Sequence, residues 1–437
     1  MRRARVRLLG LFGRPIEVRH KLRAARTQVL RWVAFSAFLG MVTGALVAVF
    51  DFLLREEVVP IVYGLRLSPV YLLLPMAGLL LSNALTRYAV PSKEGALTEA
   101  YIARYHSSNA RFSWTDLPGK LAASFVTLST GGSLGLEGPS IFLGSSLGEA
   151  IQRRFRDVFK GEDARLLMVA GAAAGVAAIF KAPLTGLLFA LEALHRDGIA
   201  GRAFIPAMVA SASSYVTFAL LAGSEVLFAV ETHRAFDLHD LIWAIPLGVC
   251  CGLLARFFSR LVRSTRTLFE RLPRWARPLL AGLVLGLAGV LVFRVAGEPF
   301  LYGPGYRLVQ HVLAGSEPLE TVLLFWCAKA FATALTLAGG GVGGVFFPLV
   351  VLGTLTGSAF GRTVVGSSDS LYPLVGLAAF VGAGYRTPVA AVAFVAETTG
   401  NPWALIPAMV ATVAGYLSIG GEGISDAQRS VAGDSRN

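Results

Sequence analysis

One carboxylate stands at the end of a glycine-rich break in an apolar part of the chain. Glu137 follows the glycines of residues 131–135 and directly precedes Gly138-Pro139. Proline suits the first turn of a helix, so a helix is predicted to begin here. The first turn of a helix carries unpaired N–H groups and about half a positive charge, and glycine lets the backbone approach a ligand closely. Gly135, Gly138 and Pro139 are therefore predicted to bind a small anion.

A second glycine-rich break, residues 339–344, leads in the same way into residues 345–348, which end in a proline. Two helix starts that converge inside a membrane would hold a dehydrated anion without a full positive charge. A full charge would bind the anion too tightly for fast release. The residues predicted to form this half of the anion site are Gly344, Val345, Phe346 and Phe347. The alternative is that these glycines serve only close helix packing.

Close packing alone does not account for Glu137. A carboxylate buried at a helix start within lipid is costly, and it marks a functional site by default. Its negative charge suits the same N–H groups that an anion would use. Glu137 is therefore predicted to act as a gate, which occupies the anion's place when charged and leaves it when protonated or displaced.

The two breaks belong to an internal duplication. Pro139 is followed by Gly144 and Gly148 at the spacing with which Pro348 is followed by Gly353 and Gly357. Residues 171–183 match residues 376–388, and each segment ends in a proline that precedes a glutamate by the same interval. Those glutamates are Glu192 and Glu397. Duplications of this kind are typical of transporters, whose substrate site lies between the repeats.

The composition indicates a membrane protein. The chain has 437 residues, of which 54% are hydrophobic and 15% charged, and its mean hydropathy is +0.62. Soluble chains carry about a quarter charged residues. Uncharged apolar runs recur, for example residues 33–50 and 279–293. A full span needs about 20 such residues, and several segments here are shorter. Many helices are therefore predicted not to cross the membrane fully.

The formal charge of +13 is concentrated in arginines at the N-terminus and in residues 256–277. This distribution follows the positive-inside pattern and predicts cytoplasmic termini and an inner (plasma) membrane location. These arginines lie at the ends of apolar segments and in loops, and a nucleic-acid partner is not expected. Residues 8–12 are too short an apolar run for a signal peptide. The three cysteines have neither metal-ligand nor disulfide spacing, so neither a metal nor a cofactor is expected.

An enzyme of another class is a weak alternative. Residues 131–135 spell Gly-x-Ser-x-Gly, but this nucleophile motif needs a preceding strand and a histidine partner. The segment here is apolar and helical in pattern, and no phosphate-binding Gly-Lys-Ser string exists in the chain. The chain is therefore predicted not to be an enzyme.

In combination, these motifs resemble the CLC family of chloride channels and chloride/proton antiporters. Residues 135–139 are similar to the family's G-[KR]-E-G-P, and residues 344–348 to its G-x-F-x-P. Residues 181–186 and 386–388 resemble the helix starts that follow each motif. The resemblance covers residues 33 to 428. It implies an all-α polytopic fold, an inverted repeat of about 18 helices, and a homodimer with one anion pathway per subunit. It also implies that Glu137 is the external gate.

The predicted organisation has five parts. They are a cytoplasmic basic N-terminal helix (1–31), a first membrane repeat (32–200), a connecting helix and loop (201–239), a second membrane repeat (240–420), and a C-terminal helix with a short cytoplasmic tail (421–437).

Several positions depart from the family pattern. Ala193 stands where antiporters usually carry an internal proton-transferring glutamate, and Glu192 matches a different, structural carboxylate. The alignment puts Ala96 at the family's central serine and Ser425 at its central tyrosine, so Ser425 is the candidate ligand there. Leu136 replaces the usual basic residue. Lys181 either draws anions into an inner vestibule or serves a structural purpose shared with Arg386.

These departures favour passive or loosely proton-coupled conduction of a small anion, with chloride expected first. Two alternatives remain. One is a chloride/proton antiporter with another internal proton route, through Glu192, Glu99 or water. The other is a transporter of fluoride, nitrate or bicarbonate, since the missing serine and tyrosine could change ion preference.

Overall fold

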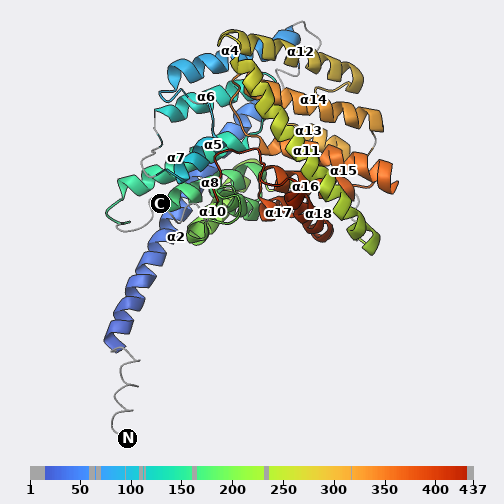
Figure 1. Ribbon diagram of the computed structural model, residues 1–437. Coiled ribbons are helices and arrows are strands. Elements are labelled where there is room, and N and C mark those ends of the chain that lie inside the picture. Colours follow the sequence, from blue (N-terminus) through green and yellow to red (C-terminus); the bar gives the residue numbers. More distant parts are fainter. Residues whose placement is uncertain are drawn as a thin grey trace.

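The computed structural model describes residues 15–430 apart from 59–63, 65–69, 94, 108–111, 113–114, 160–164, 231–235 and 316. Within this part it describes side chains from residue 29 onward, except those of residues 56 and 57. The arginines before residue 15 lie outside this part. The described residues form sixteen α-helices and isolated β-bridges but no strand, which confirms the all-α prediction. Figure 1 shows the helices packed into one body, from which the first half of α2 projects.

The first half of the chain contains eight helices, of which the first is the longest. Their bounds are α2 (Pro15–Phe52), α4 (Val70–Ala89), α5 (Thr98–Tyr105), α6 (Asp116–Ser129), α7 (Glu137–Arg154), α8 (Leu166–Phe180), α9 (Pro183–Glu192) and α10 (Phe204–Ala222). The second half begins with α11 (Leu238–Glu270), α12 (Ala276–Ala296), α13 (Tyr306–Leu313) and α14 (Leu319–Ala338), and ends with α15 (Phe346–Phe360), α16 (Leu371–Gly384), α17 (Pro388–Thr399) and α18 (Leu405–Ser418).

Seven helical segments of the described chain are long and apolar enough to cross a membrane. They are residues 29–55, 70–89, 201–222, 238–270, 276–296, 319–338 and 346–365. The shorter apolar helices include α8, α9, α16 and α17. Large apolar side chains such as Leu253 and Leu287 are exposed on the long helices. Such surfaces suit lipid, and the mixture of full and partial spans confirms the prediction for a polytopic membrane protein.

The repeated glycines bring paired helices into contact in both halves. A Cβ added at Gly144 of α7 would overlap the carbonyl of Gly171 in α8. A Cβ added at Gly353 of α15 would lie 2.6 Å from the carbonyl oxygen of Gly376 in α16. Since these positions match in the duplication, the same close helix crossing is built twice. The first helix of each pair carries one of the two predicted anion-binding starts.

The two repeats also cap each other's helices. Glu192 of α9 accepts hydrogen bonds from the N–H groups of Val389 (3.2 Å) and Ala390 (2.8 Å), in the first turn of α17. Glu397 of α17 accepts them from the N–H groups of Leu184 (2.8 Å) and Thr185 (2.7 Å), in the first turn of α9. Each carboxylate thus satisfies orphan donors at a proline-started helix of the opposite repeat.

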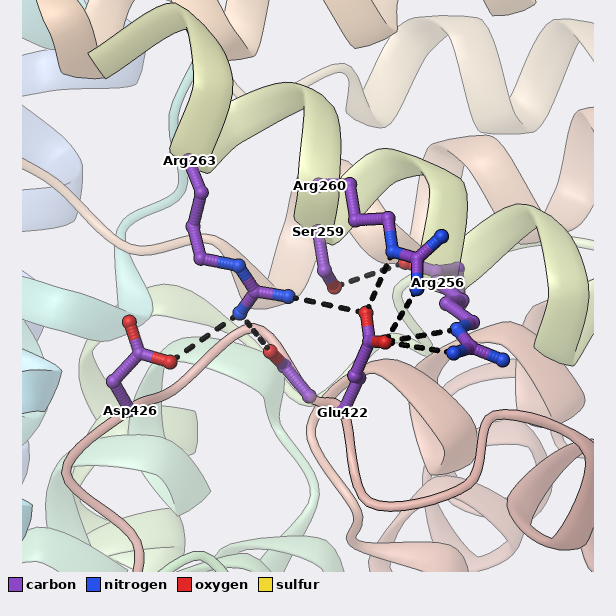
Figure 2. A network of polar contacts seen from close by, with 8 residues as sticks. Arg256, Ser259, Arg260, Arg263, Glu422 and Asp426 are labelled. Carbon is purple, nitrogen blue, oxygen red and sulfur yellow. Dashed lines mark hydrogen bonds and ion pairs between the residues drawn. The ribbon is translucent and has the colours of Figure 1, made fainter. Parts of the chain in front are cut away.

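The chain after α18 differs from its prediction. A helix was expected from residue 421, but residues 421–430 form turns, coil and a bridge between Arg429 and His195. Figure 2 shows how this segment is held: Glu422 receives hydrogen bonds from Arg256 (2.8 Å) and Arg260 (2.6 Å) of α11, and Arg263 lies between Glu422 and Asp426. Side-chain contacts with a neighbouring helix thus replace helical hydrogen bonds in this segment.

Candidate functional site

The two glycine-rich breaks meet in the centre of the fold. The Gly135 N–H donates to the Gly344 carbonyl (2.8 Å), and the Gly344 N–H donates to the Gly135 carbonyl (2.9 Å). Close approach is possible because these residues lack side chains: a Cβ on Gly138 would lie 2.7 Å from the Gly344 nitrogen. The reciprocal pair fixes the start of α7 against the start of α15. Sequence segments about 200 residues apart are therefore one structural unit, as the duplication predicted.

The Glu137 side chain crosses from α7 to the start of α15. It is fully buried, and its Oε1 accepts hydrogen bonds from the N–H of Phe346 (2.6 Å) and, more weakly, of Phe347 (3.4 Å). These are orphan donors of the first turn of α15, where the helix dipole also favours negative charge. The carboxylate is thus bound in the place where the sequence predicts an anion.

Two glycines leave room for this carboxylate. A Cβ on Gly135 would overlap the Glu137 carboxylate, and its three nearest neighbours would all be atoms of that one side chain. A Cβ on Gly344 would overlap the same carboxylate from the other side and would also press on the Gly138 nitrogen. We call this space, bounded by Gly135, Gly344 and the N–H groups of Phe346 and Phe347, the carboxylate seat.

Aromatic rings surround the seat. The Phe346 ring packs against Phe180 and Phe189 with centroids 5.0 and 5.1 Å apart, and the Phe347 ring lies 3.8 Å from that of Tyr306. Such a wall excludes water and strengthens the electrostatic interactions inside it. Phe180, Phe189 and Tyr306 were not among the site residues predicted from the sequence. Phe180 could have been suspected, because it directly precedes Lys181 at the repeat position that Tyr385 occupies in the second half.

A cavity of about 210 Å³ lies next to the break between α6 and α7. Its lining includes Leu136, which precedes the gate residue, together with Arg55, Tyr306 and Arg307. The Arg55 guanidinium stands 4.0 Å from the centre of the Tyr306 ring, and its Nε lies 2.5 Å from Asp51. This cavity, which we call the Arg55 cavity, is lined mainly by apolar residues, and Arg55 and Arg307 are its basic groups.

Three of the positions that depart from the family pattern are hydrogen-bonded, and one of them contacts Glu99 at the start of α5. The Ser425 hydroxyl donates to Glu99 Oε2 (2.9 Å), so this serine is hydrogen-bonded to a carboxylate. The Ala96 carbonyl accepts from the Lys120 ammonium (3.2 Å), and the Ala193 carbonyl accepts from Gln428 (3.0 Å). Both alanines contribute backbone oxygens to this region. Anion binding by Ser425 stays a prediction.

Lys181 and Arg386 occupy equivalent backbone positions. Lys181 ends α8 with φ = 52° and Arg386 follows α16 with φ = 57°, both in the left-handed region that non-glycine residues rarely adopt. Each residue turns the chain from one helix of its repeat into the proline-started helix that follows. This shared conformation favours the structural interpretation of Lys181 over the vestibule interpretation.

Comparison with known proteins agrees with this architecture. Residues 78–419 match the family model described as voltage gated chloride channel. The chain belongs to this family. Among curated relatives, the H(+)/Cl(-) exchange transporter ClcA of Cronobacter sakazakii is 30% identical, over 75% of this chain and 70% of the relative. The protein of the same name from Citrobacter koseri is 28% identical. The relatives are transporters, which agrees with the prediction that the chain is not an enzyme.

Solved structures of the family share the fold. A slow cyanobacterial Cl−/H+ antiporter superposes with a TM-score of 0.80 at 24% identity, covering 90% of this chain and 96% of the other. A CLC-type fluoride/proton antiporter gives a TM-score of 0.78 at 20% identity, with 92% and 98% covered. Membership of this family and the helical architecture together identify a multi-pass protein for anion transport of the CLC type.

Proposed function

We propose that this chain carries a small inorganic anion, chloride first, through the carboxylate seat, with Glu137 as the gate. The observation that carries the proposal is the position of the Glu137 carboxylate on the N–H groups of Phe346 and Phe347. A site that binds one anionic group through backbone donors suits a free anion in the same place. Competition between the carboxylate and the anion then makes conduction depend on whether Glu137 is charged.

We further propose that proton coupling is loose or absent. Ala193 has no group that can carry a proton, at the position where the resemblance implies an internal glutamate. Its neighbour Glu192 caps α17 through the N–H groups of Val389 and Ala390. Both of its oxygens are thus used to hold the first turn of a helix in the opposite repeat, which is a structural role.

The test uses purified protein in chloride-loaded liposomes, with chloride efflux and external pH recorded together. Wild type is expected to release chloride with little proton uptake. Glu137→Gln keeps the size of the gate but removes its charge, so chloride efflux should rise several-fold and lose its pH dependence. Glu320→Gln, at an exposed position in the first turn of α14, is the matched control and should behave as wild type.

Two outcomes would contradict these proposals separately. Absence of flux for chloride, fluoride, nitrate and bicarbonate, with folded protein in the liposomes, would reject anion transport. Sustained proton uptake driven only by a chloride gradient, and lost in Glu137→Gln, would reject loose coupling. That second outcome would favour proton exchange through Glu99, a carboxylate that accepts a hydrogen bond from Ser425 in the segment after α18. Glu99→Gln would then stop proton uptake and preserve chloride flux.

The homodimer, the plasma membrane and the cytoplasmic termini also remain proposals. Their support is the family resemblance and the arginine pattern, since Arg256, Arg260 and Arg263 of α11 all meet the segment after α18. A basic helix end and the C-terminal segment therefore lie on one side of the molecule, which the positive-inside rule assigns to the cytoplasm.

A further inference from the structure

The family's central serine and tyrosine positions supply no free hydroxyl in this chain. Ala96 has none, and the hydroxyl of Ser425 is donated to Glu99. A dehydrated anion that leaves the carboxylate seat on the side away from the Arg55 cavity would still need donors without full charge. The residues that contact Val345 and Phe346 on this side are therefore the candidates for such donors.

Tyr385 is a tyrosine whose ring contacts that of Phe346. It directly follows α16, its side chain is 2% exposed, and its ring packs 6.1 Å from the Phe346 ring and 5.4 Å from the Phe189 ring. Gln428 donates to the Tyr385 carbonyl (2.9 Å) and to the Ala193 carbonyl (3.0 Å), and so fixes the backbone. Both the ring and the main chain of Tyr385 are thus held in position.

The Tyr385 hydroxyl has polar neighbours on several sides. The backbone of Val345 and the side chain of Thr98 lie beside it. Val345 is the N-cap of α15 and directly precedes Phe346, whose N–H holds the Glu137 carboxylate. The hydroxyl therefore lies beside the residue that precedes Phe346, next to the carboxylate seat.

The duplication provides an independent argument. Tyr385 and Phe180 occupy equivalent positions, since each directly precedes a basic residue in the left-handed conformation. Both rings pack against Phe346, at centroid distances of 6.1 and 5.0 Å. A phenylalanine is enough for the ring contact with Phe346, since Phe180 makes this contact in the first repeat. The hydroxyl that the second repeat adds is a polar group in a buried aromatic cluster, and it lies beside Thr98 and the Val345 backbone at the start of α15.

We propose that the Tyr385 hydroxyl, with Thr98 beside it, is an anion ligand next to the carboxylate seat. This inference rests on the proposed anion transport and names donors for it that the family alignment does not assign. A tyrosine hydroxyl donates one hydrogen bond and carries no net charge at neutral pH, so it binds an anion while allowing release. When Glu137 leaves the seat, the anion would contact Val345, Phe346 and the Tyr385 hydroxyl together.

The experiment measures chloride binding by titration calorimetry and chloride efflux from liposomes. Tyr385→Phe removes one oxygen and preserves the ring contacts, and chloride affinity should fall roughly tenfold, as expected for one hydrogen bond to a charged partner. Thr98→Val, which is nearly isosteric, should weaken binding by a smaller factor. The control Tyr372→Phe removes a buried hydroxyl that donates to Asp240 at the other end of α16, and its chloride affinity should equal that of wild type.

Failure of this inference is distinguishable from failure of the proposed function. If wild type binds and transports chloride and both variants match it, the ligand assignment is wrong while anion transport stands. If wild type neither binds nor transports any tested anion, the proposed function itself fails. Should Tyr385→Phe not fold, Thr98→Val decides. With bromide in crystals of wild type, anomalous density beside Tyr385 supports the assignment and density confined to the Arg55 cavity rejects it.

Discussion

At the scale of single residues, the gate depends on the absence of a Cβ at Gly135. The three atoms nearest to a Cβ on Gly135 all belong to the Glu137 carboxylate, which is the far end of a flexible side chain. Gly135→Ala should therefore fold and displace only the carboxylate from its seat. Chloride efflux from liposomes should rise several-fold, as in Glu137→Gln.

A double variant tests this steric explanation. In Glu137→Ala protein the carboxylate is absent, so adding Gly135→Ala should change efflux little, because the two changes act through the same atoms. Fully additive effects would show that Gly135 acts in another way. Gly421→Ala, where a Cβ meets nothing within 4 Å, is the matched control and should leave efflux unchanged.

The sequence predicted the polar half of this site and not the aromatic half. Glu137 was recognisable because a charged residue is unusual in an apolar segment, and the glycines because their spacing recurs in both halves. Phe180, Phe189 and Tyr385 are ordinary members of apolar segments, and only the packing of distant helices brings them onto Phe346. Pairing of this kind has no local signal in a single sequence.

At the scale of helices, the crosswise caps make Glu192 and Glu397 structural residues. Glu397→Ala would leave the N–H groups of Leu184 and Thr185 without their acceptor, together with the Thr185 hydroxyl that also donates to Glu397 (2.8 Å). Unfolding followed by denaturant in detergent micelles should show a loss of about 3 kcal/mol. Glu320→Gln is again the control, with no loss expected.

A variant of the other capping residue, Glu192, distinguishes a structural role from a role in proton transfer. Glu192→Gln keeps one acceptor oxygen of the two that bind Val389 and Ala390, so stability should fall by about 1 kcal/mol. The ratio of protons to chloride, whatever its value in wild type, should not change. A variant with wild-type stability and an altered ratio would instead make Glu192 part of a proton route.

The repeat explains why these helices were predictable while the C-terminal segment was not. Proline and glycine fix where α9 and α17 begin, and the same spacing recurs in both halves, so each half supports the other. The spacings that recur in both halves end at Glu397, before residues 421–430. Their conformation is set by arginines of α11 and by Gln428, which bonds to two distant carbonyls. The sequence near residue 421 contains none of this information.

At the scale of the whole molecule, one acidic side chain connects the end of the chain to the membrane domain. Glu422 accepts from Arg256, Arg260 and Arg263, and this charge cluster lowers the pKa of Glu422 to about 2 (Figure 2). In the same segment, Ser425 donates a hydrogen bond to Glu99, and Gln428 donates one to the Tyr385 carbonyl. The conformation of residues 421–430 therefore affects the part of the proposed anion site where Tyr385 lies.

The pKa of Glu422 sets how this attachment responds to pH. Because the pKa in the folded protein is below the ordinary value of 4.5, the attachment is complete above about pH 4.5 and weakens only as the pH falls toward 2. Hydrogen exchange of residues 421–430, corrected for intrinsic rates, should be equal at pH 5 and pH 8. Glu422→Gln removes the charge at every pH, so exchange should become faster there, while Glu270→Gln, which breaks only a pair within α11, should leave it unchanged. Equal protection in Glu422→Gln and wild type would mean that Gln428 and the Arg429 bridge hold the segment without the arginines.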